Sequence, residues 1–166
     1  METPIIAQNG FIWVVQSKSG GGGVMVFNES DGADNARLLT GTYEQGNLPD
    51  RRVNDMAEDL DGEIWVATEN GVGVFATPET IFDGGEANDA FTPIFEGRPL
   101  LENENASCIA VDGGNRKWIG TNSGLWLFEP DGTTVVHNFT TDNSPLPSNK
   151  INDIAIHQQT GEVFIG

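Results

Sequence analysis

The apolar residues of this chain fall in short runs separated by glycine-rich turns, and no long stretch repeats at the spacing of an amphipathic helix. Asp-Gly, Asn-Gly and Gly-Gly steps recur between the runs, and these residues accept the positive φ of tight hairpin turns. The runs at 65–67 and 125–128 are apolar at every position, which is typical of strands buried on both faces. The pattern therefore predicts an all-β protein made of short strands.

One pattern recurs four times along the chain, each time around an aromatic residue that we call the anchor. The anchors are Trp13, Trp65, Trp118 and Phe164, and they follow one another after 52, 53 and 46 residues. An apolar strand precedes each of the last three anchors, at 53–58, 106–111 and 151–156, and another follows each of the first three, at 23–27, 71–75 and 124–128. A less regular fourth strand is clearest at 134–139. Repeats of this length, with four strands each, predict the blades of a β-propeller.

The predicted fold is a partial β-propeller of tandem four-stranded antiparallel blades, about three blades and the start of a fourth. The blades are expected at about 5–50, 51–104, 105–149 and 150–166, the last one partial. The anchors are expected to fill the wedges between blades, where a buried tryptophan contributes roughly 2–3 kcal/mol. Because an open arc exposes apolar blade faces, we expect it to pair with the remaining blades of a longer parent chain or with a second copy.

Two stretches carry a more specific signature. Leu48-Pro49 is followed by Val53-Asn54-Asp55-Met56-Ala57 and then by Asp61-Gly62-Glu63-Ile64-Trp65-Val66-Ala67-Thr68, and Leu146-Pro147 opens a similar stretch that runs to Gly166. This pattern resembles the two-component regulator propeller repeat. The middle copy departs from it, since Leu100-Leu101 stands where Leu-Pro is expected. The resemblance implies the propeller fold and says little about function.

Residues 109–166 resemble the PorZ-type propeller proteins of type IX secretion in Bacteroidetes, through Asn115-Arg116-Lys117-Trp118-Ile119-Gly120-Thr121 and the segments after it. That resemblance implies an extracytoplasmic protein, periplasmic or at the cell surface, that helps attach exported cargo to lipopolysaccharide. The family's sorting domain does not occur in this sequence. The leading expectation is therefore a non-catalytic interaction or scaffold module of an exported protein. The oligosaccharide-sensing periplasmic propeller of a hybrid two-component regulator is the alternative, and a propeller-fold polysaccharide-active enzyme is the third.

The charge of the chain narrows the range of partners. Its 8 Lys and Arg residues face 25 Asp and Glu residues, which gives a formal charge of −17. Such a field repels phosphate backbones and anionic lipid, so we expect neither nucleic-acid binding nor docking on a membrane. No segment approaches the roughly 18 apolar residues that a membrane-spanning helix needs.

Candidate chemistry is sparse. Cys108 lies in an apolar run and is expected to be a buried hydrophobe, and neither His137 nor His157 stands in a motif with it, so we predict no catalytic and no metal-binding residues. The acidic turn at 58–63 contains part of a calcium-loop pattern without its distal glutamate, which leaves weak Ca²⁺ binding at acidic turns as the one cofactor hypothesis. Gly20 to Gly23 lack the Lys-Ser/Thr of a phosphate-binding loop and are interpreted as a flexible insertion.

A binding surface is expected on one rim of the propeller. The loops between blades and the turns between second and third strands share that rim, and loops on rigid scaffolds commonly carry function. The candidate residues, which would contact a protein or glycan ligand, are Arg51, Arg52, Glu69, Asn70, Asn122, Ser123, Asn149 and Lys150.

Overall fold

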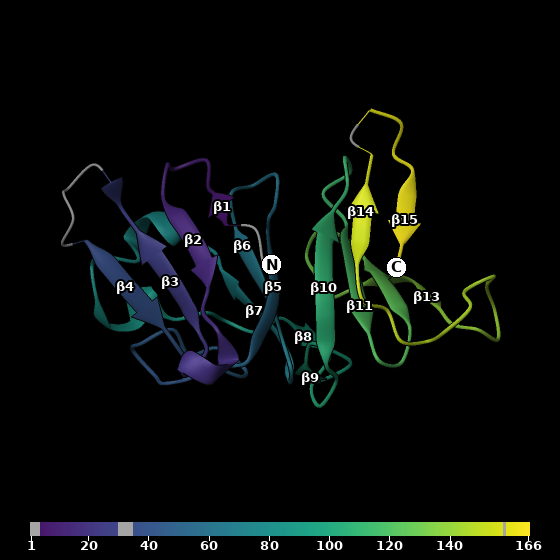
Figure 1. The fold of residues 1–166 in the computed structure, drawn as a ribbon, viewed down its shortest axis with the longest axis horizontal. Coiled ribbons are helices and arrows are strands. Elements are labelled where there is room, and N and C mark those ends of the chain that lie inside the picture. Colours follow the sequence, from purple (N-terminus) through teal and green to yellow (C-terminus); the bar gives the residue numbers. More distant parts are fainter. Residues whose placement is uncertain (1–3, 30–34, 158) are drawn as a thin grey trace.

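The computed structural model describes residues 4–29, 35–157 and 159–166, and they fold as a row of small antiparallel sheets (Figure 1). The first blade consists of β1 (Ile5–Ile6), β2 (Ile12–Val15), β3 (Val24–Phe27) and β4 (Ala36–Leu39), paired in that order. Within the described ranges the helical elements are the short 3₁₀ turns Lys18–Gly20, Pro78–Thr80 and Gly85–Asn88. None of the described helices is long and apolar enough to cross a bilayer.

The later blades repeat this plan with local variations. The second blade pairs β5 (Val53–Glu58), β6 (Ile64–Thr68) and β7 (Gly71–Phe75), and a single bridge from Val74 to Phe91 stands in place of a fourth strand. A hairpin of β8 (Ile94–Phe95) and β9 (Arg98–Pro99) leads to the third blade, β10 (Ala106–Val111), β11 (Lys117–Thr121), β12 (Leu125–Phe128) and β13 (Val135–Phe139). The fourth unit is the pair β14 (Ile154–Ile156) and β15 (Val163–Ile165).

The first strands of the blades lie side by side, β1 next to β5, β5 next to β10 and β10 next to β14, with the later strands of each blade further out. In Figure 1, β10 stands at the boundary between the first two blades and the last two units. This is the predicted partial propeller of antiparallel blades, and the fold prediction is confirmed.

Each anchor pairs with the same position of its inner strand, Trp13 with Ile5, Trp65 with Ala57, Trp118 with Ala110 and Phe164 with Ala155. Trp13 packs on Phe75 of the second blade, with 5.3 Å between ring centroids. Trp65 packs among Leu100, Ile109, Ile119 and Phe128, at the third blade. Trp13 and Trp65 thus face the following blade.

Anchor burial falls along the chain, which corrects the expectation of a buried wedge for the last two. Trp13 and Trp65 are buried at 0% and 1% exposure, whereas Phe164 is 59% exposed. Trp118 is half-buried, stacking on Phe139 at 5.9 Å between centroids and contacting the two-stranded fourth unit. The physical reason is the number of residues that pack over each anchor. The two strands of the fourth unit cannot enclose Trp118, and the described residues leave most of Phe164 exposed.

The glycine-rich segment 20–23 is a tight turn and not the flexible insertion that the sequence suggests. Gly23 N donates to Arg51 O at 2.6 Å, and a Cβ on Gly22 would meet that same oxygen at 2.3 Å. Both glycines have positive φ, at 73° and 96°. The turn therefore requires glycine, because the backbone of the next blade comes too close for any side chain.

A buried ion pair joins the second and third blades. Lys117 and Asp59 have side chains exposed by 0% and 1%, and Lys117 Nζ lies 2.8 Å from Asp59 Oδ2. The ammonium also donates to the carbonyls of Asn115 and Pro130 and lies 4.7 Å from the centre of the Trp65 ring. All its donors are used, which is the condition under which a charge is tolerated in a core.

Candidate binding rim

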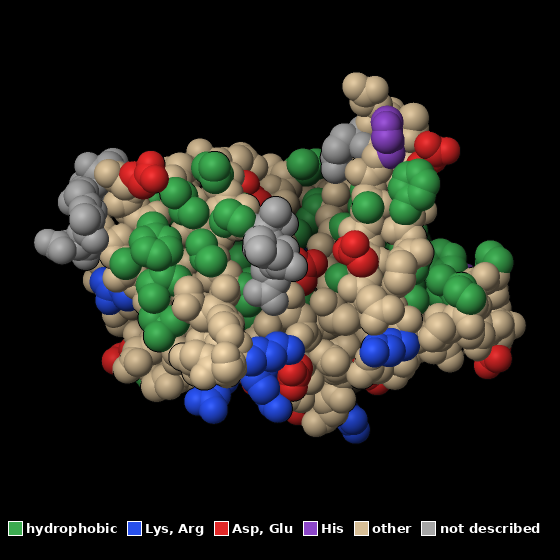
Figure 2. All heavy atoms as spheres, viewed as in Figure 1, with side chains coloured by type: hydrophobic (Ala, Val, Ile, Leu, Met, Phe, Trp, Pro, Cys, Tyr) green, Lys and Arg blue, Asp and Glu red, His purple; other side chains and the backbone are tan. Residues whose placement is uncertain are grey.

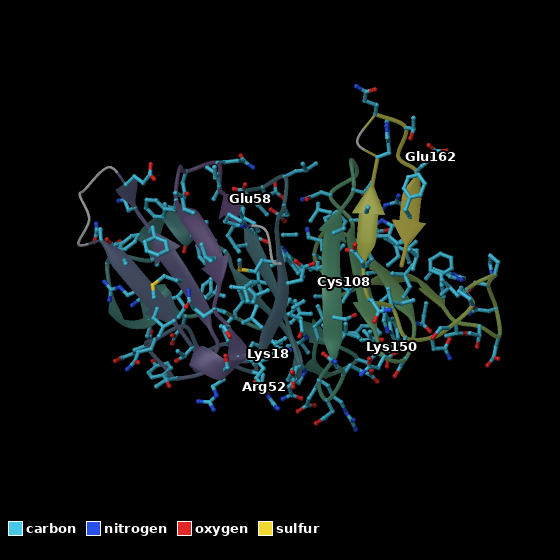
Figure 3. All side chains as sticks on the ribbon, in the orientation of Figure 1. Lys18, Arg52, Glu58, Cys108, Lys150 and Glu162 are labelled. Atoms are coloured by element: carbon cyan, nitrogen blue, oxygen red, sulfur yellow. The ribbon has the colours of Figure 1, made fainter. Side chains whose placement is uncertain are left out.

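The loops that precede each inner strand and the turns between second and third strands lie along one edge of the molecule. Figure 3 shows Lys18, Arg52 and Lys150 at this edge, with Glu58 and Glu162 at the opposite edge. In Figure 2 most of the Lys and Arg side chains visible from this side lie along the same lower edge. We call this surface the basic rim and define it by five of the eight basic residues of the chain, Lys18, Arg51, Arg52, Arg98 and Lys150.

Two of the rim cations belong to an internal network. Glu69 bridges two blades, because Oε1 lies 2.8 Å from Lys18 Nζ and Oε2 lies 3.1 Å from an Arg52 guanidinium nitrogen. Arg52 also pairs with Asp50 at 2.8 Å, and Lys18 donates to Asn54 Oδ1 at 2.7 Å. The Arg52 hydrogen bond lowers the pKa of Asp50 below its usual range, and the pKa of Arg52 is raised in return. This network holds the rim loops in place.

Arg51 is placed differently from its neighbour. Its side chain is exposed, and in the described parts of the chain it forms no ion pair. It stands at a cavity of about 550 Å³. The cavity is lined by Gly21, Thr40, Gly41, Thr42, Gln45, Leu48, Pro49, Asp50 and Arg51. An exposed guanidinium beside hydroxyl and amide groups suits a polar or anionic ligand, although the Asp50 carboxylate in the same lining partly offsets its charge.

The other predicted rim residues have unequal roles. Asn70 Oδ1 accepts from the Asn103 backbone at 3.0 Å, and Asn149 Oδ1 accepts from the Thr141 backbone at 2.8 Å, so both amides stabilise loops. Asn122, Ser123 and Lys150 are exposed. The Asn122 side chain forms no hydrogen bond with any residue that the structure describes. Of the predicted set, the structure brings Arg52 and Glu69 into direct contact.

Lys18, Asp50, Asn54 and Arg98 are rim residues that the sequence interpretation missed. The repeat itself carried the signal for Lys18, because aligning Trp13 with Trp65 places Ser17-Lys18 at the turn occupied by Glu69-Asn70. Asp50 lies within the predicted loop but was passed over in favour of the two arginines. Asn54 could not be found this way, since its contact with Lys18 depends on how two blades meet.

The acidic turn has a structural role at Asp59. Its Oδ1 accepts from the backbone of Asp61 and Glu63, both at 2.9 Å, and its Oδ2 pairs with Lys117. Burial on its own raises the pKa of Asp59, but the hydrogen bonds from Lys117 and the turn outweigh it, and the net pKa is lowered. No cluster of three or more His, Cys, Asp or Glu side chains suited to a metal forms among the described residues, and Ca²⁺ binding stays a hypothesis.

Cys108 is buried and carries a free thiol. Burial raises its pKa to about 11, so the reactive thiolate is disfavoured at neutral pH. The residue packs with Leu125, Ile151 and Ile154, in agreement with its interpretation as a small hydrophobe.

Comparison with known proteins agrees with this architecture. Residues 47–70 match the family model of the two-component regulator propeller, which confirms the repeat identified from the sequence. No match is found among curated protein sequences.

Solved structures match over nearly the whole chain. PorZ of Porphyromonas gingivalis, described as an essential bacterial surface component of the type IX secretion system, is 25% identical with a TM-score of 0.80 over 99% of this chain. The extracellular domain of a putative hybrid two-component system from B. thetaiotaomicron is 22% identical with a TM-score of 0.71 over 99% of this chain. Virginiamycin B lyase from Staphylococcus aureus, an enzyme, is 13% identical with a TM-score of 0.57 over 98% of this chain, a likeness of fold alone.

The chain spans only part of each of these proteins, 24%, 19% and 54% of their chains respectively. The first two are a surface component and an extracellular domain, which is consistent with the predicted extracytoplasmic class.

Proposed function

We propose that this chain is a non-catalytic interaction module of an exported protein associated with type IX secretion, with the basic rim as its binding surface. The observation that carries the proposal is the match to PorZ along 99% of this chain at a TM-score of 0.80. The overall charge of −17 makes a rim that concentrates the positive charges a distinct surface, suited to steering an acidic partner.

Arg51 is the residue at which we expect contact. Arg52 and Lys18 form ion pairs with carboxylates of the chain itself, whereas Arg51 stands beside the cavity without an ion pair to any described residue. A carboxylated glycan or an acidic protein segment would pair with the guanidinium and hydrogen-bond to Thr42 and Gln45. Both ligands would present a carboxylate, so the assay must distinguish a glycan from a protein segment.

The first test is a glycan array probed with the chain and with three variants. Arg51→Ala should reduce binding about tenfold, as expected for the loss of a charge-assisted hydrogen bond. Asn122→Ala tests the rim more cleanly than Asn70→Ala, because Asn70 also stabilises the loop at Asn103. Arg37→Ala is the matched control, since it removes the same charge from β4, an outer strand.

The results of this assay distinguish an interaction module from a sensor and from an enzyme. Binding to acidic glycans that falls with Arg51→Ala and not with Arg37→Ala supports the rim. Tight binding of one neutral oligosaccharide would favour the sensor function instead. Turnover of a polysaccharide by the purified chain would overturn the non-catalytic assignment. Protease treatment of intact cells that make the full-length protein tests export, and a protein protected on both intact and outer-membrane-permeabilised cells would contradict it.

A further inference from the structure

The second blade departs from the repeat after its third strand. The first and third blades end in a fourth strand, β4 and β13, whereas the second has a single bridge between Val74 and Phe91 in that place. Residues 76–104 then form two 3₁₀ turns and the β8–β9 hairpin, which lies at the lower edge of Figure 1, close to β10. Long irregular segments on a rigid scaffold commonly bind ligands. The repeat does not dictate this segment, so its features need another explanation.

The hairpin brings an aromatic and a basic side chain together. Glu96 and Gly97 form its tight turn, with φ of 51° and 78°, and Phe95 pairs with Arg98 across it. Directly paired residues of an antiparallel hairpin have their side chains on the same face. Phe95 packs edge-on against Trp126 of β12, with 6.2 Å between ring centroids. Arg98 therefore lies on the face of the hairpin that is turned to the outer strands of the third blade.

Trp126 forms the opposite wall. It is half-buried and stacks on Phe128 with 5.8 Å between ring centroids. Its indole nitrogen is buried and has no hydrogen-bond partner among the described residues, whereas the indole of Trp118 donates to Asp112. Packing alone therefore sets the orientation of the Trp126 ring, and part of its surface is exposed.

A third wall is a loop with a strained backbone. Leu101 and Asn103 have φ of 55° and 65°, in the left-handed region that residues other than glycine adopt at a cost. Hydrogen bonds hold the loop, because Asn103 N donates to Asn70 Oδ1 at 3.0 Å, Gly71 N to Glu104 O at 2.9 Å and Glu104 N to Leu101 O at 2.9 Å. Strain of this kind clusters at functional sites. Asn70 thus positions the loop beside the hairpin.

The three walls border a cavity of about 400 Å³. Its apolar lining consists of Phe95, Pro99, Leu101 and Trp126, and its charged lining of Glu96, Arg98 and Glu102. The charged side chains are all exposed, and none of them forms an ion pair with a residue that the structure describes. None of these seven residues lines the cavity beside Arg51.

The lining suits a ligand that combines an apolar group with charges of both signs. Aromatic and aliphatic walls favour an apolar group, the guanidinium favours a carboxylate, and the two carboxylates favour a cation. A neutral sugar has no charge to offer to either sign, and a purely acidic ligand would meet two carboxylates. A peptide segment provides all three groups together.

We propose that the β8–β9 hairpin, the loop at 101–104 and β12 form a binding site for a peptide segment of a partner protein. An apolar side chain of the segment packs on Trp126 and Phe95, an acidic neighbour pairs with Arg98, and a basic neighbour pairs with Glu96 or Glu102. The acidic ligand proposed for Arg51 differs from this one, and the two cavities are separate. The site therefore goes beyond the proposed function and does not depend on it.

The test is a titration of the nitrogen-labelled chain with the end-blocked peptides Gly-Lys-Phe-Asp-Gly and Gly-Asp-Phe-Lys-Gly. The indole N–H signal of Trp126 in NMR spectra is the readout, and Trp126→Phe identifies that signal by removing it. We expect a saturable shift with one of the two peptides, with a dissociation constant below about 1 mM. A peptide with serine in place of phenylalanine should bind about tenfold more weakly, because it lacks the apolar group.

The variants test the charges. Arg98→Ala should raise the dissociation constant about tenfold, whereas Glu102→Gln should raise it less, since Glu96 still offers a carboxylate. Arg37→Ala and Glu162→Gln, which remove the same charges elsewhere, should change it by less than about twofold. Urea denaturation of each variant shows whether it remains folded.

Reversing the charge at one position gives the sharpest result. Arg98→Glu should bind a peptide in which lysine replaces the aspartate more tightly than the original peptide, a reversal that mere loss of structure would not produce. Because the signal belongs to Trp126, failure of ligand binding at Arg51 would leave these measurements unaffected.

Three results would overturn the proposal. The first is a Trp126 signal that neither peptide moves in a saturable way. The second is equal binding of the peptides with phenylalanine and with serine. The third is a saturable shift caused by a neutral oligosaccharide and by neither peptide, because the cavity would then bind a glycan.

Discussion

The interface between the second and third blades and the interface between the third blade and the fourth unit follow one plan with different chemistry. At the first, Asp55 ties two inner strands, Trp65 is 1% exposed, and Lys117 pairs with Asp59 in the core. At the second, a cysteine replaces the aspartate and the anchor Trp118 is only half-buried. Its indole N–H donates to Asp112 of its own blade at 3.0 Å.

The comparison shows which contacts occur at both interfaces and which contact occurs at one of them. Both interfaces have an anchor facing the next blade and a side chain of the inner strand that donates to a carbonyl of that blade, from Asn54 to Ala106 and from Ser107 to Ile151. The buried charge pair occurs at one interface, because the repeat places Ile64 and Val163 where the third blade has Lys117. The predictions below test whether this difference in contacts is also a difference in energy.

Lys117→Met should have the largest effect, a loss of about 3–5 kcal/mol of unfolding free energy, because it leaves the Asp59 charge buried and unpaired. Urea denaturation of the purified chain measures it. Lys150→Met, at an exposed rim position, should change stability by less than about 0.5 kcal/mol. The double variant Lys117→Met with Asp59→Leu should regain much of the loss, and a double variant as unstable as the single one would contradict the account of the ion pair.

Trp65→Ala should cost about 3–5 kcal/mol, the usual loss for a fully buried aromatic residue. Trp118→Ala should cost about half as much, since part of its ring is already in water. Thermal or urea unfolding of both variants gives the ratio. Equal losses would mean that the two interfaces are equivalent despite their different cover.

Asp55→Ala should cost about 1.5–3 kcal/mol, the range for a hydrogen bond to a charged group. Hydrogen exchange gives a local measurement, because the Ile109 amide should lose protection in this variant. Cys108→Ala, at the corresponding place in the next blade, should leave the neighbouring Ile154 amide unaffected. Unchanged exchange at Ile109 would show that the aspartate does not tie the blades together.

Lowering the pH should reduce the difference in unfolding free energy between the wild-type chain and Lys117→Met. The pKa of Asp59 is lowered in the folded chain, so its stabilisation is present above its unfolded pKa near 4 and is lost as pH falls through the folded value. Without Lys117, burial raises that pKa instead, and protonation relieves the buried charge. Denaturation at about pH 6 and about pH 3.5 should therefore give a smaller difference at the lower pH, and a constant difference would contradict the assignment.

The fold could be predicted from the sequence because the pattern occurs four times, so an irregularity in one copy does not hide it. Trp13, Trp65, Trp118 and Phe164 recur at blade-like spacing, and apolar runs flank them in the same order each time. The burial of two individual anchors was predicted wrongly. Burial depends on the strands that cover a residue, and neither Trp118 nor Phe164 carries any local sign that its cover is incomplete.

The rim was predicted as a surface and only partly as a set of residues. Loop position could be inferred from the repeat, so Arg51 and Asn122 were correctly expected on exposed loops, and their binding role stays a prediction. Sequence could not separate Arg51 from Arg52, because the difference lies in their ion pairs. Arg52 pairs with Asp50 and Glu69, whereas Arg51 forms no ion pair with the described residues. The Lys117 ion pair was missed for a similar reason, since its two members lie 58 positions apart.

The hydrogen bonds from Asn54 and Ser107 to the main chain of the next blade also bear on how such a chain could evolve. Asn54 and Ser107 bind carbonyl oxygens, which every amino acid possesses, so the neighbouring blade can change its side chains without losing the bond. Duplication of a blade would therefore bring a working joint with it and need no matching mutation elsewhere. The Lys117–Asp59 pair behaves in the opposite way, because each partner requires the other. A change of neighbour would leave the main-chain contacts intact, whereas separating the second and third blades would leave a buried charge unpaired.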